Sequence, residues 1–500
     1  MSKETDARSL GSVLTALAIA DPGKPALTCD DQTLSRAELE RRANRLARSF
    51  ALHGVSQDDF VAIVLPNGSE FVASVFACWK IGATPLPMSV RLAPAELEAS
   101  LRLVKPALVV GIDPARMLES PWIPASYVPA EELSDAPLPD RFGKAWKAIL
   151  SGGSTGRPKI IVDGRPGTLG PHTLNPTIRG DDVVLVSGPM HHNAGFKHCM
   201  NGLLAGARVI LMPRFDALEA IRLVRQWQVS WVSLVPTMMN RIWKLRRDDE
   251  IPSDLPSLRV LYHAGAPCPP WLKEAFIEWL GADRIFEIYG GTENNGLTFI
   301  SGAEWLEHRG SVGRPVAGYR FRILDREGRE VGPGEVGDIY MRPDAGPGTT
   351  YRYIGAPPCR ERDGWETLGD VGYLDRDGYL YICDRDTDMI LRGGANIYPA
   401  EIEAAIDSHP LVWSSAVIGL PDEDLGSRIH AVVHGDAHLS EAALREHLCE
   451  RLARYKQPAT IEFVSTPVRD DAGKVRRGAL RAVRTATGRA GHLHPTRLGI

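Results

Sequence analysis

The chain has 500 residues, of which 44% are hydrophobic and 24% are charged, the ordinary balance of a globular enzyme with two or three domains. Its 58 basic and 62 acidic residues leave a formal net charge of -4, which argues against a nucleic-acid binder. The sequence has no run of about 18 apolar residues, so no membrane span is expected. Seven scattered cysteines without a Cys-x-x-Cys pair, and a polar N-terminus, predict a cytoplasmic protein.

Helical and strand patterns alternate through the first two thirds of the chain. Apolar residues at helical spacing predict helices over residues 39–52 and 71–81. Short apolar runs predict buried strands at 61–66, 107–111, 182–188, 207–212, 231–236 and 258–265. This alternation is typical of α/β layers with largely parallel sheets.

The pattern changes at about Tyr319. Short strands separated by Asp-Arg-Glu-Gly and Asp-Arg-Asp-Gly turns predict a small β-rich module at about residues 319–384. An α+β unit follows, with helices at 399–409 and 440–454 and strands at 415–419, 429–433 and 460–464. We therefore expect an N-terminal domain of residues 1–384, a hinge at about 384–388 and a C-terminal domain of residues 389–500. Arg476 to Arg484 are expected to be a solvated end of the chain.

The strongest local signal is the segment ILSGGSTGRPK at residues 149–159. Its glycines let the backbone turn tightly and point amide groups inward, while Ser151, Ser154 and Thr155 add hydroxyl donors. With the positive charge of Lys159, the segment predicts a cradle for a polyphosphate. It is not a Walker loop, because Gly-Lys-Ser/Thr does not occur in it. A flexible Gly/Ser surface loop is the alternative.

SGGSTGRPK resembles the phosphate-loop signature of the acyl-adenylate-forming superfamily, which comprises acyl-CoA synthetases, adenylation domains and luciferases. Six further segments resemble signatures of that family and follow in its order: PMHHNAG (189–195), HAGAPCP (263–269), YGGTE (289–293), LGD (368–370), DRDTDMILRGGANIYPAEIE (384–403) and DDAGKVRR (470–477). The resemblance implies a fold of the α/β class. It has a large N-terminal domain of layered α/β subdomains with a small β-rich module, and a small mobile α+β C-terminal domain.

The resemblance also implies an ATP site. Asp370 would accept both ribose hydroxyls, although after a glycine it could simply make a turn, and Arg385 has a fork suited to ribose or phosphate oxygens. The nucleotide-binding residues implied by the motifs are Ser151, Gly153, Ser154, Thr155, Gly156, Lys159, Gly265, Ala266, Pro267, Tyr289, Gly290, Asp370 and Arg385.

Four residues are implied to carry the chemistry. Thr292 would hydrogen-bond the α-phosphate, and Glu293 would hold the Mg2+ that neutralises the departing pyrophosphate. Lys474 would bring a point charge to the acid and the bridging oxygen, unless it is only a surface lysine near a basic tail. His192 would be a gate near the acid and thiol tunnels, although the neighbouring His191 competes for that role and either could be a core histidine.

The implied mechanism has two half-reactions, with coenzyme A as the acceptor in the second. A rotation about Thr387 would follow adenylation. Gly393 and Gly394 would then let pantetheine pass close to the backbone, unless they only end a strand. Several positions depart from the family pattern: Gly152 for a hydroxyl residue, Ile160 and Asp384 for glycines, Thr387 for an Asp or Lys, and an unusual Gly/Pro-rich segment at residues 163–177. These departures raise an alternative, an enzyme that performs mainly the thioester-forming half-reaction.

The acid is the least defined part of this interpretation. His192, Gly290 and Gly291 are expected to line the acyl pocket, and the two adjacent glycines predict a wide one. Stretches such as SGAEWLEHRGSVGRP and LVPTMMNRIWKL most resemble ligases for bile acids, steroid side chains and terpenoid acids. We therefore expect a large, apolar, polycyclic acid, followed by a substituted aromatic acid and a medium-chain fatty acid.

Other classes of function remain open. The protein could load a carrier protein in trans, or it could be an impaired nucleotide or acyl binder. The presence of all four charged motif residues argues against impairment; these are Glu293, Asp370, Arg385 and Lys474. An oxygenase, as in luciferases, has nothing specific in its favour. The oligomeric state also stays open, with a homodimer as one alternative to a monomer.

Overall fold

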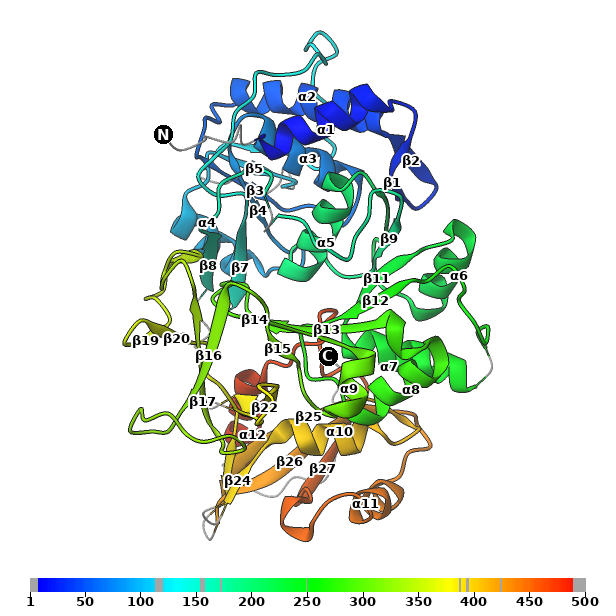
Figure 1. Cartoon of the computed structure of the whole chain (residues 1–500), viewed down its shortest axis with the longest axis vertical. Coiled ribbons are helices and arrows are strands. Elements are labelled where there is room, and N and C mark those ends of the chain that lie inside the picture. Colours follow the sequence, from blue (N-terminus) through cyan, green and yellow to red (C-terminus); the bar gives the residue numbers. More distant parts are fainter. Residues whose placement is uncertain are drawn as a thin grey trace.

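A computed structural model describes residues 8–112, 120–152, 158–170, 173–248, 250–385, 388–392, 395–422 and 425–488. In Figure 1 the α/β layers of the N-terminal part occupy the top and middle, and the C-terminal strands and helices lie at the bottom. The predicted fold class is confirmed: a large layered α/β region is joined to a small α+β unit. Within the described residues, no helix is long and apolar enough to cross a membrane.

A nine-stranded sheet forms the centre of the N-terminal region. Its strands from β1 through β10, β9, β11 and β12 to β13 are parallel, as the alternating pattern predicted. The order across the sheet is β15 (Arg314–Pro315), β14 (Leu297–Ser301), β13 (Ile285–Gly290), β12 (Val260–His263), β11 (Trp231–Leu234), β9 (Val183–Val186), β10 (Arg208–Leu211), β1 (Pro25–Cys29) and β2 (Gln32–Ser35).

Helices cover both faces of this sheet. The first helices begin at cap residues that fix their start: Ser35 and Glu38 form a capping box, so α2 begins at Arg36, three residues before the apolar pattern. One face packs on α1 (Leu10–Ala20), α2 (Arg36–Leu52), α3 (Ser69–Lys80) and α5 (Asn193–Leu204). The other face packs on α6 (Ala217–Trp227), α7 (Pro236–Arg247), α8 (Pro270–Leu280) and α9 (Gly302–Glu307).

A second layer lies on the far side of α1, α2 and α3. The core of these helices includes residues of a four-stranded sheet: β4 (Thr84–Pro87), β3 (Phe60–Ile63), β5 (Leu108–Val110) and β6 (Trp122–Ile123). Its other face packs on α4 (Pro94–Val104) and on a three-stranded sheet of β18 (Tyr351–Ile354), β8 (Pro158–Asp163) and β7 (Ala148–Gly152).

The predicted β-rich module contains one strand that belongs elsewhere. β18 lies in the 319–384 range but pairs with β8, so this segment returns to the α/β layers. The remaining strands form a six-stranded sheet: β16 (Tyr319–Leu324), β17 (Gly337–Pro343), β19 (Arg360–Arg362), β20 (Trp365–Thr367), β21 (Asp370–Leu374) and β22 (Leu380–Arg385).

The C-terminal unit has its own core. It contains the pair β23 (Ile390–Arg392) and β24 (Ala395–Ile397), the sheet of β25 (Val412–Asp422), β26 (Gly426–Gly435) and β27 (Thr460–Val464), and the helices α10 (Pro399–Asp407) and α11 (Glu441–Cys449). Helix α11 ends at Cys449, earlier than predicted. The prediction ran too far because Leu452 continues the apolar spacing, although it reaches the same core from outside the helix.

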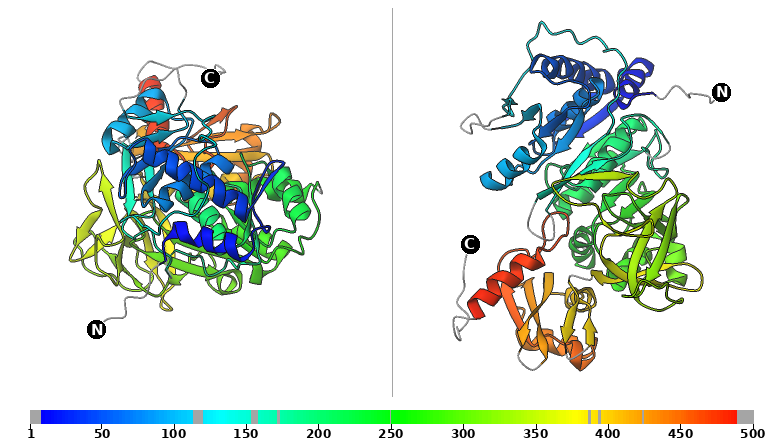
Figure 2. Two further views of the ribbon diagram at one scale, coloured as in Figure 1. Left: turned by 90° about the horizontal axis from the view of Figure 1, so that it is seen from above. Right: turned by 90° about the vertical axis from the view of Figure 1, so that its left-hand side faces the viewer.

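The expectation that Arg476 to Arg484 form a solvated chain end is wrong for Arg477 and Arg484, whereas Arg476 is 81% exposed. This stretch lies largely in helix α12 (Arg477–Gly488), drawn in red along the C-terminal sheet in Figure 2. Arg477 bonds Glu403 at 2.7 and 2.9 Å and Asp388 at 2.9 Å, and Arg484 bonds Glu462 at 2.6 and 2.7 Å. Carboxylates distant in sequence therefore neutralise these charges, which the local pattern could not indicate.

Asp384 joins the last strand of the β-rich module to the C-terminal unit. Its Oδ2 accepts a hydrogen bond from the backbone N–H of Ala400 at 3.0 Å, and its Oδ1 accepts one from that of Arg385 at 2.7 Å. Burial raises the pKa of Asp384 to about 6 against these favourable amide contacts. The side chain thus fixes the start of α10 to the strand that precedes the predicted hinge.

We expect Asp384→Asn to flatten the dependence of stability on pH. A carboxyl whose pKa is raised in the folded state stabilises the fold below its unfolded pKa and loses that contribution as pH rises through about 6. The loss is about 3 kcal/mol for a rise of about two pKa units. Calorimetric melting temperatures of wild type and variant, compared between about pH 4.5 and pH 7, should lie close together at low pH, where both side chains are neutral, and should separate as pH rises, with the wild type the less stable. Parallel curves would contradict the expectation.

Candidate active site

The motif loops meet at one edge of the nine-stranded sheet. Strands β9, β11, β12 and β13 are parallel, so the segments that follow their carboxyl ends lie together, where α/β sheets bind ligands. These segments contain His192, Gly265 to Pro267, and Thr292 with Glu293. Gly265 has a φ of 88°, a conformation that favours glycine and turns the chain directly after β12.

Glu293 is buried and held by two side chains from the three-stranded sheet. Its Oε1 accepts hydrogen bonds from Lys159 Nζ at 3.3 Å and from the Tyr353 hydroxyl at 2.6 Å. The Lys159 ammonium lies 4.0 Å from the centre of the Tyr353 ring. The second carboxylate oxygen of Glu293, Oε2, accepts no hydrogen bond from the described part of the chain, so it is available to a cation. Ser151 pairs with Lys159 in the same hairpin.

Asp370 lies between an aromatic hydroxyl and a guanidinium. Its Oδ2 accepts a hydrogen bond from Tyr289 at 2.6 Å, and its Oδ1 accepts one from Arg385 Nε at 3.2 Å. Burial, followed by the Asp370 charge, raises the pKa of Tyr289 well above its ordinary value, so the phenol stays a donor. The structure therefore brings together three of the predicted nucleotide-binding residues.

Lys474 belongs to the C-terminal unit but lies beside the N-terminal site. Its loop contacts helix α7, because a Cβ on Gly473 would come within 3.2 Å of Thr237 Oγ1. Burial lowers the pKa of the Lys474 ammonium, and the charges that act on it include Asp470, Arg385 and Glu293. No ion pair is formed by its ammonium with any residue that the structure describes.

The two histidines of the PMHHNAG segment lie next to each other, with ring centres 4.4 Å apart. His192 is the N-cap of α5 and both side chains are half-buried. Burial lowers the pKa of His191 to about 4 and that of His192 to about 3, and the Lys474 charge contributes to both shifts. Both imidazoles are therefore neutral at pH 7 and lie within electrostatic reach of the lysine.

Some predicted residues fall outside the described ranges. These are Gly153, Ser154, Thr155 and Gly156 of the phosphate segment, the hinge residue Thr387, and Gly393 and Gly394 of the implied thiol tunnel.

Packing gives another explanation, besides a wide pocket, for the glycines at positions 290 and 291 of YGGTE. A Cβ on Gly291 would lie 2.5 Å from Leu368 Cδ1 and 2.8 Å from Glu293 Oε2, and one on Gly290 would lie 2.7 Å from the Gly296 carbonyl oxygen. A side chain at Gly290 would therefore collide with backbone, and one at Gly291 would have to displace the ends of the Leu368 and Glu293 side chains. The wide pocket inferred from these glycines stays a prediction.

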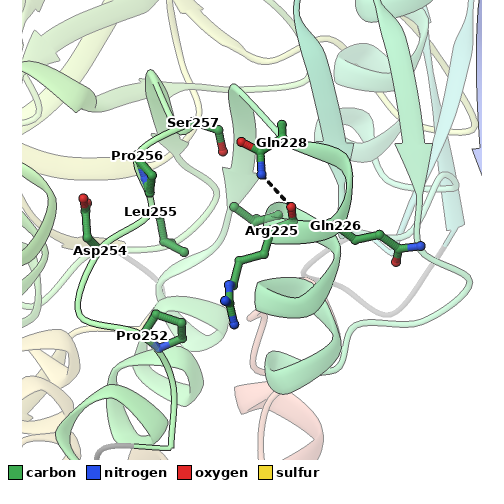
Figure 3. Close-up of a pocket in the computed structure, with 9 residues that line it drawn as sticks. Arg225, Gln226, Gln228, Pro252, Asp254, Leu255, Pro256 and Ser257 are labelled. Atoms are coloured by element: carbon green, nitrogen blue, oxygen red, sulfur yellow. Dashed lines mark hydrogen bonds between the residues drawn. The ribbon is translucent and has the colours of Figure 1, made fainter.

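The hollow shown in Figure 3 does not belong to this site. It has a volume of about 450 Å³ and is lined by residues such as Arg225, Gln228, Asp254 and Leu255. These residues precede β11 and β12, so the hollow opens at the amino end of the parallel strands. A second hollow of about 420 Å³ is bounded by residues that precede β12 and β13. Both lie at the edge opposite the motif loops.

The fold and the site together define an AMP-forming ligase of the acyl-adenylate type. The sequence pattern of the AMP-binding enzyme family matches residues 16–354, and that of the AMP-binding enzyme C-terminal domain matches residues 401–474. The chain belongs to this family.

Similar proteins indicate which kind of AMP-forming ligase this family member resembles. A 2-succinylbenzoate–CoA ligase from Bacillus licheniformis is 32% identical over 92% of this chain and 97% of its own length. A feruloyl-CoA synthase from Amycolatopsis is 33% identical over 95% and 99%. The solved o-succinylbenzoate coenzyme A synthetase from Bacillus subtilis, in complex with ATP and a magnesium ion, superposes with a TM-score of 0.79 at 28% identity over 94% and 98%.

These relatives confirm the predicted superfamily and the class of acyl-CoA ligases. The narrower resemblance to ligases for bile acids and steroids is not confirmed, because by name they act on 2-succinylbenzoate and ferulate.

Sequence reasoning missed several polar residues of the site. Tyr353 holds Glu293, and Asp163 and Arg165 form a buried ion pair near the same loop. One signal was available: the segment from Asp163 to Thr177 departs from the family pattern, and it begins with that pair.

Proposed function

We propose that the protein activates a ring-bearing carboxylic acid with ATP and transfers the acyl group to coenzyme A. The observation that carries the proposal is the contact of the Lys474 loop with the N-terminal region: Gly473 lies against Thr237 on α7, and Asp471 accepts a hydrogen bond from Arg91 at 2.7 Å. This contact joins the C-terminal unit to the segments that follow the parallel strands. The arrangement corresponds to the first half-reaction, in which the lysine faces the reacting atoms.

In that half-reaction a carboxylate oxygen attacks the α-phosphorus of ATP, and the bond from this phosphorus to the bridging oxygen breaks to release pyrophosphate. Lys474 stabilises the charge that develops on both groups. Tyr289, Asp370 and Arg385 orient the ribose by hydrogen bonds. In the second half-reaction the thiol of coenzyme A attacks the acyl carbon and AMP leaves.

A magnesium ion fits the carboxylate of Glu293. Oxygen is the ligand that Mg2+ prefers, and Oε2 of this buried side chain is available while Lys159 and Tyr353 hold Oε1. When bound there, the ion would neutralise the pyrophosphate as it departs.

The acid is either polycyclic or a substituted aromatic one. The first follows from stretches that resemble ligases for bulky ring-bearing acids. The second is favoured by the names of the two relatives, 2-succinylbenzoate and ferulate, at 32% and 33% identity. Transfer to a carrier protein in trans is the alternative for the acceptor.

The test is pyrophosphate release from ATP with steroid, terpenoid, aryl and fatty acids, each with and without coenzyme A, alongside thioester formation by mass spectrometry. Acid-dependent release with matching thioester would support both half-reactions and rank the acids. Release without thioester, restored by a purified carrier protein, would identify the other acceptor. Thioester only from a supplied acyl-adenylate would mean that the second half-reaction predominates.

Tyr353→Phe should raise the magnesium concentration needed for half-maximal activity about fivefold. The substitution keeps the ring under Lys159 but removes the hydrogen bond to Glu293, and one such bond contributes about 1 kcal/mol. Magnesium titration of acid-dependent pyrophosphate release measures the effect. Tyr351→Phe is the matched control, because that hydroxyl donates to Glu366 at 2.8 Å. Equal shifts in both variants would contradict a role at Glu293.

A further inference from the structure

The loop that carries Lys474 contains a tightly bonded turn. Asp470 Oδ1 accepts hydrogen bonds from the backbone N–H groups of Ala472 at 3.0 Å and of Lys474 at 2.8 Å. Two backbone bonds close the turn: the N–H of Asp470 donates to the Lys474 carbonyl at 2.9 Å, and that of Gly473 donates to the Asp470 carbonyl at 2.9 Å. Residues 470–474 therefore move as one piece, and a contact that fixes one of them also fixes the backbone of Lys474.

Two ion pairs tie this turn to the two units of the chain. Arg469 donates to Glu403 on α10 at 2.6 Å, within the C-terminal unit. Arg91 Nη1 donates to Asp471 Oδ2 at 2.7 Å, and Arg91 belongs to the N-terminal segment between β4 and α4. Within the ranges that the structure describes, this is the only hydrogen bond from the N-terminal region to residues 469–474.

The Arg91 pair lies at the contact that positions Lys474. A Cβ on Gly473 would come within 3.2 Å of Thr237 Oγ1 on α7, so the backbone is packed against the N-terminal region one residue before the lysine. The side chains of Arg91 and Asp471 are 66% and 35% exposed, so their pair contributes modestly and is screened by salt. A modest contribution is enough to shift the balance between two orientations that differ little in free energy.

Other bonds between the two units hold different parts of the C-terminal unit. Trp271 Nε1 on α8 donates to the Ala404 carbonyl on α10 at 3.3 Å. Lys244 on α7 donates to the Val412 carbonyl at the start of β25. Neither acceptor belongs to the turn. These bonds therefore hold the body of the C-terminal unit, whereas Arg91 holds the turn itself.

We infer that Arg91 is a positioning residue for the first half-reaction: it acts through Asp471 to hold the turn that carries Lys474 in the orientation of this structure. The inference rests on the proposed function and deepens it. The proposed rotation about Thr387 would move the turn away before the second half-reaction, so the pair has to open. A contact that exists in one orientation stabilises only that orientation, and the pair therefore favours adenylation over thioester formation.

The experiment removes the pair from either side and then rebuilds it with reversed charges. Arg91→Gln and Asp471→Asn each remove one charge, and the double variant of Arg91→Glu with Asp471→Arg restores an ion pair. Arg102→Gln is the matched control, because Arg102 pairs with Glu98 within α4 and is 62% exposed. Acid-dependent pyrophosphate release and thioester formation from a supplied acyl-adenylate are measured for each variant at about 0.01 M and about 1 M salt.

Hydrogen exchange gives a second readout that needs no turnover. With AMP present, peptides that cover residues 469–474 report whether the turn is docked, whatever acid the enzyme uses. Exchange should be faster in Arg91→Gln and Asp471→Asn than in wild type, and it should be slowed again in the charge-reversed double variant.

At low salt, each single variant should lower pyrophosphate release about two- to fivefold, as expected for the loss of a partly exposed ion pair. Thioester formation from the supplied acyl-adenylate should stay unchanged or become faster. The double variant should recover most of the loss. At about 1 M salt, wild type and single variants should approach each other, because the pair is then screened.

An equal loss of both half-reactions would overturn the inference, and so would a loss in Arg102→Gln as large as that in Arg91→Gln. A double variant as impaired as Arg91→Gln would also overturn it while leaving the proposed function intact. If no acid caused pyrophosphate release, the proposed function would fail, and hydrogen exchange would still decide whether Arg91 holds the turn.

Discussion

Replacing Lys474 by alanine is expected to lower acid-dependent pyrophosphate release about 100-fold or more, because stabilisation of developing charge is usually the largest catalytic contribution. The charges that act on the ammonium are those of Asp470, Arg385 and Glu293, and it forms no ion pair in the described ranges that would hold it for a structural purpose. Thioester formation from a supplied acyl-adenylate should stay within about threefold of wild type, since that step follows adenylation.

The control for this variant is Arg476→Ala. Arg476 lies two residues further on, carries the same charge, and is 81% exposed at 3.9 Å from Glu96. Its removal should leave both half-reactions nearly unchanged. Equal losses of the two half-reactions in Lys474→Ala would mean that the lysine supports the fold of its loop rather than the first step.

Glu403→Ala is expected to destabilise the C-terminal unit by about 3–5 kcal/mol, the cost of leaving buried charges without a partner. Glu403 is 4% exposed and lies on α10. Its carboxylate accepts hydrogen bonds from Arg469 at 2.6 Å, from Arg477 at 2.7 and 2.9 Å, and from the backbone of Val417 at 2.8 Å. One side chain thus holds the loop that carries Lys474, helix α12 and strand β25.

Calorimetry should show an earlier transition for the C-terminal unit, and limited proteolysis should cut near the loop at 469–474. Adenylation should fall more than nucleotide binding, because Asp370 and Tyr289 do not depend on this carboxylate. Glu462→Ala is the matched control: it also loses an arginine of α12, but Glu462 is 39% exposed and contacts neither Arg469 nor Arg477. A smaller effect in Glu403→Ala than in Glu462→Ala would refute the assignment.

The sequence predicted most of the parallel sheet, because buried strands are short apolar runs and their order along the chain follows the alternation with helices. It could not predict that β18 leaves the β-rich module to pair with β8, since pairing partners distant in sequence leave no local pattern. Helix α12 was missed for a related reason. Its arginines look solvated until Glu403 and Glu462 are brought to them by the fold.

In the candidate site, too, some residues could be predicted from the sequence and others only from the fold. Ordered motifs predicted Asp370 and Arg385, which the fold joins by a hydrogen bond, and Glu293, which it holds through Lys159. Lys147 and Asp163 carry no motif, and only their burial against each other distinguishes them from surface charges.

The hairpin of β7 and β8 joins two parts of the site. It carries Ser151 and Lys159 of the implied nucleotide site, and Lys159 bonds Glu293 in the loop after β13. The buried ion pair of Lys147 and Asp163 lies at the same two strands. A substitution that moves this hairpin should therefore alter nucleotide affinity and magnesium dependence together, so natural variants of this layer should show the two properties changing in parallel.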